Sequence, residues 1–243
     1  DAVEHDARRM REAGLNMVRI GEFAWCRMEP SDGRFTLGWL HEALAVLDRH
    51  GISILMCTPT ATAPAWLTQA WPETLMVDKN GACIEHGGRQ HTCYVSPRFR
   101  EYCARITDRL SRELAGHKNV VAWQIDNEIG HSRHGNCHCE ICQQAFREWL
   151  RKRYGSLENL NRCWGAVFWS QEYSDWNQVR LGDVGMHVAP SRLLDSARFF
   201  SGTKVAFIEQ QAAIIRANHP GALVATNNLS AIVNRYDGFR SLD

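Results

Sequence analysis

The sequence lacks an excess of charge of either sign, because 28 lysines and arginines stand against 27 acidic residues and the formal net charge is +1. A chain so close to neutral gives no electrostatic reason to expect binding to nucleic acid or to a membrane surface. No apolar run approaches the ~20 residues that a membrane-spanning helix needs. The first residues, 1–6, do not resemble a signal peptide. These absences favour a globular protein that binds neither nucleic acid nor membranes.

The cysteines do not form the pattern of a disulfide framework. There are nine, an odd number, and three of them lie between positions 137 and 142. A disulfide framework would spread its cysteines in pairs, so we expect reduced thiols and a cytoplasmic protein. Internal repeats and linkers are absent too. A chain of 243 residues can bury one sizeable core, and α/β barrels of this length are ordinary.

Hydrophobic periodicity alternates between helix and strand along the chain. Helices are predicted at 5–13, 37–49, 96–114, 143–153, 157–164 and 191–218, and strands at 15–20, 52–57, 120–126 and 223–226. This alternation predicts a parallel sheet with helical crossovers. Only four strands are present and the pattern opens on a helix. We therefore expect a section of a larger α/β barrel.

The third predicted strand ends in Asp126, Asn127 and Glu128. Active sites of α/β barrels lie at the carboxyl ends of the strands. Glycosidases need one carboxyl group that protonates the leaving oxygen and a second that attacks or activates water. The acid needs apolar or crowded surroundings, which Trp123 and Ile125 are expected to supply. Glu128 is thus a candidate acid, and Asn127 a candidate donor to the 2-hydroxyl of the sugar or to the other carboxylate. The alternative is an ordinary Asn-Glu pair that ends a strand.

A second pattern, Cys137-x-Cys139-x-x-Cys142, has the spacing of metal ligands. Zinc takes four ligands at tetrahedral corners, and a site closed by four thiolates is structural rather than catalytic. We expect Cys93 to be the fourth ligand. The alternatives for that position are His91, His131, His134 and His138. The competing interpretation is three free thiols in a surface loop.

Four segments together resemble glycoside hydrolase family 42, the β-galactosidases. They are Arg-Ile-Gly-Glu-Phe-Ala-Trp at 19–25, Thr-Pro-Thr-Ala-Thr-Ala-Pro-Ala-Trp-Leu at 58–67, Trp-Gln-Ile-Asp-Asn-Glu at 123–128 and Phe-Trp-Ser-Gln at 168–171. The resemblance runs from about residue 5 to the end of the chain. It implies a (β/α)8 TIM barrel whose acid/base ends strand four and whose nucleophile ends strand seven.

Several residue roles follow from this resemblance. Glu128 matches the acid/base, and Asn127, Arg19 and Trp169 match residues that line the galactose subsite. Glu22 matches a carboxylate beside that subsite. The resemblance also implies a structural zinc on Cys93, Cys137, Cys139 and Cys142, no cofactor for the chemistry itself, and a homotrimer, since family members are often trimers.

The chain departs from the family in its extent. Family members begin with a strand that this sequence lacks, and their nucleophile would fall beyond residue 243. The strands present correspond to the second to fifth of the barrel. We therefore expect residues 1–243 to be a fragment of one catalytic barrel domain, with the zinc-binding cysteines inserted after the fourth strand.

Three other functions compete with that of a retaining β-galactosidase. One is a zinc-stapled carbohydrate-binding or interaction module without catalysis. A second is a zinc hydrolase that uses the cysteine cluster. The third keeps the scaffold but prefers an α-L-arabinopyranoside, which matches galactose without its hydroxymethyl group. Metal stoichiometry and the response to a chelator separate the first two from a glycosidase.

Overall fold

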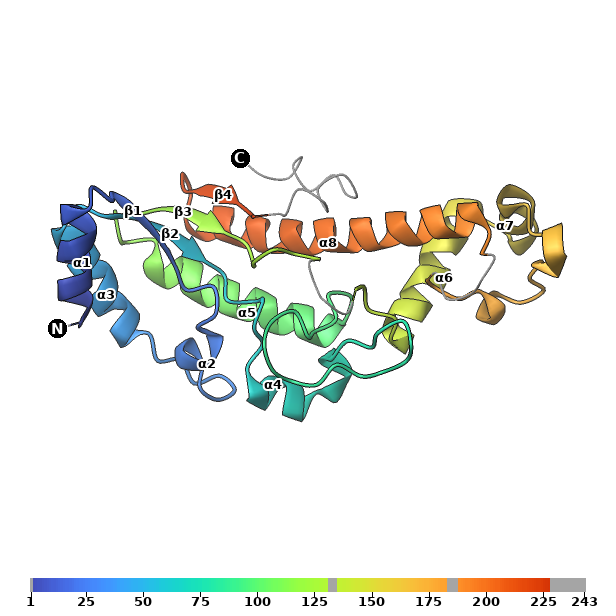
Figure 1. Ribbon diagram of the computed structural model, residues 1–243, viewed down its shortest axis with the longest axis horizontal. Helices are drawn as coiled ribbons and strands as arrows, with labels where there is room; N and C mark the ends of the chain where they lie inside the picture. The colour runs from blue at the N-terminus through green and yellow to red at the C-terminus, as the bar shows by residue number, and fades with distance from the viewer. Residues whose placement is uncertain (1, 131–134, 183–187, 228–243) are drawn as a thin grey trace.

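The computed structural model describes residues 2–130, 135–182 and 188–227. Within them, four strands form one parallel sheet in the order β1-β2-β3-β4 (Figure 1). The strands are Met17–Ile20 (β1), Ser53–Cys57 (β2), Val120–Gln124 (β3) and Leu223–Ala225 (β4). In the register Ile20 pairs with Met56, and Gln124 pairs with both Cys57 and Ala225. All four strands therefore end at the same rim.

Helices connect successive strands and cover one face of the sheet, as the alternating pattern predicts. The larger ones are α1 (Ala2–Glu12), α3 (Gly38–Arg49), α5 (Pro97–Leu114) and α8 (Pro190–Asn218). The start of α5 is set locally, because the Ser96 hydroxyl accepts a hydrogen bond from Phe99 N at 3.3 Å. Proline in the first turn adds a preset φ, as expected from the sequence.

Some short elements of the fold were not predicted from the sequence. The helices α2 (Trp25–Met28) and α4 (Ala65–Ala70) lie in connections, with a 3₁₀ turn at Pro72–Thr74 after α4. Four to six residues are too few to display a helical period. β3 also ends two residues before its predicted end at 126. The reason is that Asp126 has φ of 54° and leaves the extended conformation.

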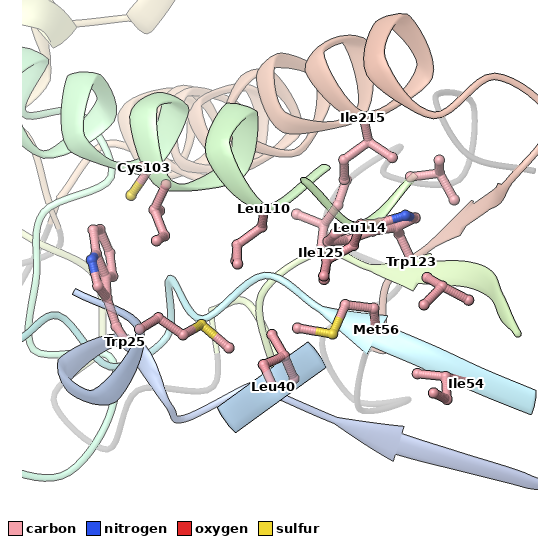
Figure 2. Packing of buried hydrophobic residues seen from close by; sticks show 14 of the residues in the cluster. Trp25, Leu40, Ile54, Met56, Cys103, Leu110, Leu114, Trp123, Ile125 and Ile215 are labelled. Atoms are coloured by element: carbon pink, nitrogen blue, oxygen red, sulfur yellow. The ribbon is translucent and has the colours of Figure 1, made fainter. Parts of the chain in front are cut away.

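The main core lies between the sheet and the helices that cover it (Figure 2). Met56 from β2 and Trp123 from β3 meet Leu110 of α5 and Ile215 of α8, and all four side chains are fully buried. Burying each such side chain contributes roughly 1.5–3 kcal/mol. The indole of Trp123 also donates a hydrogen bond to His219 Nδ1 at 3.1 Å. This packing holds the strand that leads to Glu128.

A second cluster of buried side chains lies beyond the end of α8 that is remote from the sheet (Figure 1). Here α6 (Glu140–Tyr154) and α7 (Leu157–Trp164) pack beside the start of α8. Short 3₁₀ turns follow at Phe168–Ser170 and Trp176–Gln178. The cluster includes Cys93 and Cys142. None of the helices that the structure describes combines the length and apolar character that crossing a bilayer requires.

Candidate active site

The turn that follows β3 carries the candidate acid. Asp126 and Glu128 both have positive φ, 54° and 52°, a conformation that costs a non-glycine residue free energy and persists only where neighbours impose it. Thr58 and Thr60 supply part of that constraint. Asp126 N donates to Thr58 Oγ1 at 2.8 Å, and Thr60 Oγ1 donates to Asp126 Oδ2 at 2.7 Å. Asn127 N donates to Asp126 Oδ1 at 2.7 Å. The Asp126 side chain thus organises the turn from beneath.

Complete burial raises the pKa of the Asp126 carboxyl to about 6, against hydrogen bonds from Thr60 and Asn127 N that lower it. An isolated carboxylate is costly to keep out of water, and no cation is among the causes of this shift. Asp126 therefore stabilises the turn by accepting hydrogen bonds from Thr60 Oγ1 and Asn127 N. Its side chain is fully buried, and both carboxylate oxygens already accept hydrogen bonds within the fold.

Glu128 itself lies at the rim, with 23% of its side chain exposed. Its backbone N–H donates to Asn227 Oδ1 at 2.9 Å, and Asn227 Nδ2 donates to Asn127 Oδ1 at 3.0 Å. Asn227 stands two residues after β4, so this contact joins the ends of two neighbouring strands. Asn227 is not among the site residues predicted from the sequence, which places only a strand at 223–226 before it. The signal that could have found it is its place on the same rim as Glu128.

The connection between β2 and α5 brings two more residues to this turn. Gln90 Nε2 donates to Asn127 O at 2.7 Å and to Glu128 O at 2.6 Å. Arg89 Nη2 lies 2.7 Å from Glu128 Oε2, an ion pair by distance whose angles fall short of a hydrogen bond. Sequence reasoning missed both residues, because the stretch 73–95 has no periodicity that would place it.

Arg19 and Glu22 come from the end of β1. Arg19 Nη2 pairs with Glu22 Oε1 at 3.0 Å, and Arg19 Nη1 donates to Gln124 Oε1 at 3.3 Å. Gln124 Nε2 in turn donates to Asp126 O at 2.9 Å. The structure therefore brings four of the five residues predicted for catalysis and substrate binding to one rim, connected through buried amides.

Trp169 does not join them within this chain. It follows α7, at the opposite end of α8 from the sheet (Figure 1). Its side chain is 60% exposed and stacks on Phe168, with ring centroids 4.6 Å apart. The expectation that Trp123 and Ile125 surround Glu128 is wrong. Both side chains point into the core between the sheet and the helices (Figure 2). Residues two apart in a strand face the same side of the sheet, and here that side is covered by helices.

The four predicted metal ligands do come together. The sulfur atoms of Cys93, Cys137, Cys139 and Cys142 all lie within 4.8 Å of one another. Cys93 Sγ is 3.4 Å from Cys142 Sγ and 3.7 Å from Cys139 Sγ. Four sulfurs placed ~2.3 Å from one tetrahedral zinc are about 3.8 Å apart, so this set fits such an ion.

The two histidine alternatives that the structure describes, His91 and His138, are not part of this group. His91 is buried beside His86, and the His138 ring packs edge-on against Phe200. His131 and His134 lie outside the described residues. All nine cysteines fall within the described part of the chain, and each is a free thiol.

Parallel strands with helical crossovers, and polar residues gathered at the carboxyl rim, define a portion of a (β/α)8-barrel enzyme. The family model of glycoside hydrolase family 42, described as beta-galactosidase, matches residues 1–243. The chain belongs to this family.

Curated relatives and solved structures are similar over nearly the whole chain. The beta-galactosidase BgaA of a Thermus species is 45% identical over 97% of this chain and 37% of its own length. The beta-galactosidase structure from the psychrophilic Marinomonas ef1 has a TM-score of 0.93 at 34% identity, covering 99% of this chain and 37% of that one. The Halorubrum lacusprofundi structure has a TM-score of 0.91 at 39% identity, with 99% and 36% covered. The chain therefore spans little more than a third of these relatives.

Proposed function

We propose that residues 1–243 are the acid/base-bearing part of a retaining β-galactosidase. The observation that carries this proposal is the placement of Glu128, partly exposed at the rim with its backbone fixed by Asn227 and Gln90. Relatives that are named beta-galactosidases support the choice of substrate. The second carboxylate, the nucleophile, belongs by this proposal to a strand outside residues 1–243. The domain would be one catalytic barrel with the cysteine cluster inserted after its fourth strand.

In the first chemical step the nucleophile attacks the anomeric carbon while Glu128 protonates the departing oxygen. In the second step Glu128 takes a proton from water, which releases galactose. Asn127 would bind the sugar in both steps. Its Oδ1 accepts a hydrogen bond from Asn227 Nδ2, which fixes the orientation of the side-chain amide. Its amide NH₂ is the group left to donate to a sugar hydroxyl. Arg19 and Glu22 line the proposed galactose subsite at this rim. Trp169, which lies away from the rim, is assigned to the subsite by the family resemblance alone.

The four cysteines would hold a structural zinc, since a site closed by four thiolates has no open position for substrate. The chemistry itself needs no cofactor. Reduced thiols agree with a cytoplasmic location, and assembly as a homotrimer remains a prediction.

The test of this proposal is Glu128→Gln in the full-length enzyme. We expect galactoside cleavage to slow by ~10²–10⁴-fold, the usual contribution of general acid catalysis. The loss should be smaller for a nitrophenolate leaving group, which needs little protonation. Glu148→Gln, an exposed carboxylate on α6, is the matched control and should act as wild type. Equal losses for good and poor leaving groups would contradict the acid role.

A further inference from the structure

The backbone carbonyls of Asn127 and Glu128 are held by a side chain from another part of the fold. A primary amide has two N–H donors, and Gln90 Nε2 reaches both carbonyls, at 2.7 and 2.6 Å. Gln90 is only 3% exposed, and its backbone N donates to Ala61 O at 2.8 Å. The backbone of Gln90 has φ of 59° and that of Glu128 has φ of 52°. Two residues in the left-handed conformation are therefore joined by the hydrogen bond from Gln90 Nε2 to Glu128 O. The buried Gln90 amide therefore holds the backbone on both sides of the Asn127–Glu128 peptide.

Arg89, the residue before Gln90, contacts the Glu128 carboxylate itself. Arg89 Nη2 lies 2.7 Å from Glu128 Oε2, with the Arg89 side chain 41% exposed. Among the described residues, the other charged or titratable groups on the segments around the turn include Asp126 after β3, Arg19 in β1 and Glu22 after it, His91 beside Gln90 and Lys204 on α8.

Those other groups have interactions of their own. Arg19 pairs with Glu22, and Lys204 Nζ donates to Asn136 Oδ1 at 2.9 Å. The His91 ring is buried and lies against His86, with ring centroids 5.0 Å apart. Arg89 is therefore a cation that the fold directs at the Glu128 carboxylate.

We propose that Arg89 and Gln90 form a clamp that positions Glu128 and stabilises its ionised form. The proposal rests on the function proposed above for Glu128. An acid/base must be protonated in the first step and ionised when it activates water in the second. Arg89 supports the second state and releases the carboxyl group when it carries a proton. Gln90 keeps the backbone fixed through both steps.

The experiment measures pH profiles of kcat/KM and kcat for the full-length enzyme with Arg89→Met, Arg89→Gln, Arg89→Lys and Gln90→Met. Lys79→Met, an exposed cation in the same connection, is the matched control. Both charge-removing Arg89 variants take away a positive charge that lies 2.7 Å from Glu128 Oε2. The alkaline limit of kcat/KM, where the acid loses its proton, should therefore rise by ~1 pH unit in Arg89→Met and Arg89→Gln. Arg89→Lys should restore the wild-type limit.

Gln90→Met should lower kcat roughly tenfold with little change in KM and no shift of the alkaline limit, since two hydrogen bonds are lost but no charge. Glu128→Gln is measured in parallel on good and poor leaving groups. The loss of activity in Glu128→Gln tests the acid/base role, and the alkaline limit of the Arg89 variants tests the clamp. If the loss depends on the leaving group but Arg89→Met and Arg89→Gln keep the wild-type alkaline limit, the clamp is wrong and the role of Glu128 stands. Equal losses in Glu128→Gln would overturn both proposals. Should Arg89→Met fail to fold, Arg89→Gln decides, with thermal unfolding of every variant as the check.

Discussion

At the scale of single residues, the two carboxyl groups of one turn, on Asp126 and Glu128, differ in their exposure to solvent. Asp126 is sealed beneath the turn, whereas Glu128 lies at the rim beside Arg89. In an extended strand Asp126 and Glu128 would face the same side. The positive φ of both residues breaks that alternation, so one carboxyl group is buried and the other reaches the rim. The sequence predicted that Glu128 would reach the rim. The burial of Asp126 depends on Thr58 and Thr60, which only the folded chain brings beside it.

The raised pKa of Asp126 predicts how stability depends on pH. A carboxyl group with a raised pKa in the folded state stabilises it most below its ordinary value of 3.8. That contribution is lost as the pH rises through about 6. The loss is on the order of 3 kcal/mol for this fully buried group.

Asp126→Asn in the full-length enzyme should remove this component. The amide can still accept from Asn127 N and donate to the Thr60 hydroxyl. Thermal unfolding at pH 4.5 and pH 7.5 measures the effect, and the variant should lose less stability than wild type between the two. Asp175→Asn, on the exposed Trp176–Gln178 turn, serves as the control. An unchanged pH dependence in Asp126→Asn would refute the assignment.

At the scale of elements, the cysteine cluster joins the two segments that meet at Glu128. Cys93 stands three residues after Gln90, and Cys137 and Cys139 follow the turn that carries Glu128. Cys142 lies in the first turn of α6, within the second apolar cluster. A metal bound here would cross-link the β2–α5 connection, the loop after β3 and α6. Such a metal would therefore support the site from a distance.

We expect one zinc per chain with four sulfur ligands at ~2.3 Å. X-ray absorption on protein expressed with zinc measures both the element and its ligands. A majority of nitrogen or oxygen ligands, or no bound metal, would contradict the expectation.

Removal of the metal should act on stability first. A strong chelator should lower the unfolding temperature, and activity should disappear together with the fold, because the metal cross-links segments rather than contacting substrate. Loss of activity from a protein that stays folded would instead favour a zinc hydrolase.

Elements with long, regular patterns were predictable, and irregular ones were not. The periodicity of residues 96–114 and the three-cysteine spacing are local signals, and the fold contains both the helix α5 and the grouped cysteine sulfurs. Arg89 and Gln90 lie in a stretch whose path is set by tertiary hydrogen bonds such as Gln90 N to Ala61 O. The distance of Trp169 from the rim likewise depends on how α6 and α7 pack, which periodicity does not specify.

At the scale of the whole molecule, the described sheet is an open array of four parallel strands, with β1 and β4 at its edges. Open edges offer unpaired backbone groups to other chains. Apolar side chains at these edges, Met17 and Leu223, are 47% and 62% exposed. We therefore expect residues 1–243 alone to aggregate or remain partly unfolded. Light scattering during purification measures this, and a stable monomeric species would contradict it.

The most direct test of the account is the β-galactosidase turnover of residues 1–243 measured beside the full-length enzyme. Retaining chemistry needs two carboxyl groups ~5–5.5 Å apart, and the proposal places only Glu128 in this part of the chain. We predict measurable turnover for the full-length enzyme and none for the short chain. Turnover by the short chain at a similar rate would mean that the nucleophile lies within it. The carboxylates to replace first would then be Glu22, which pairs with Arg19, and Asp237, which lies outside the described residues.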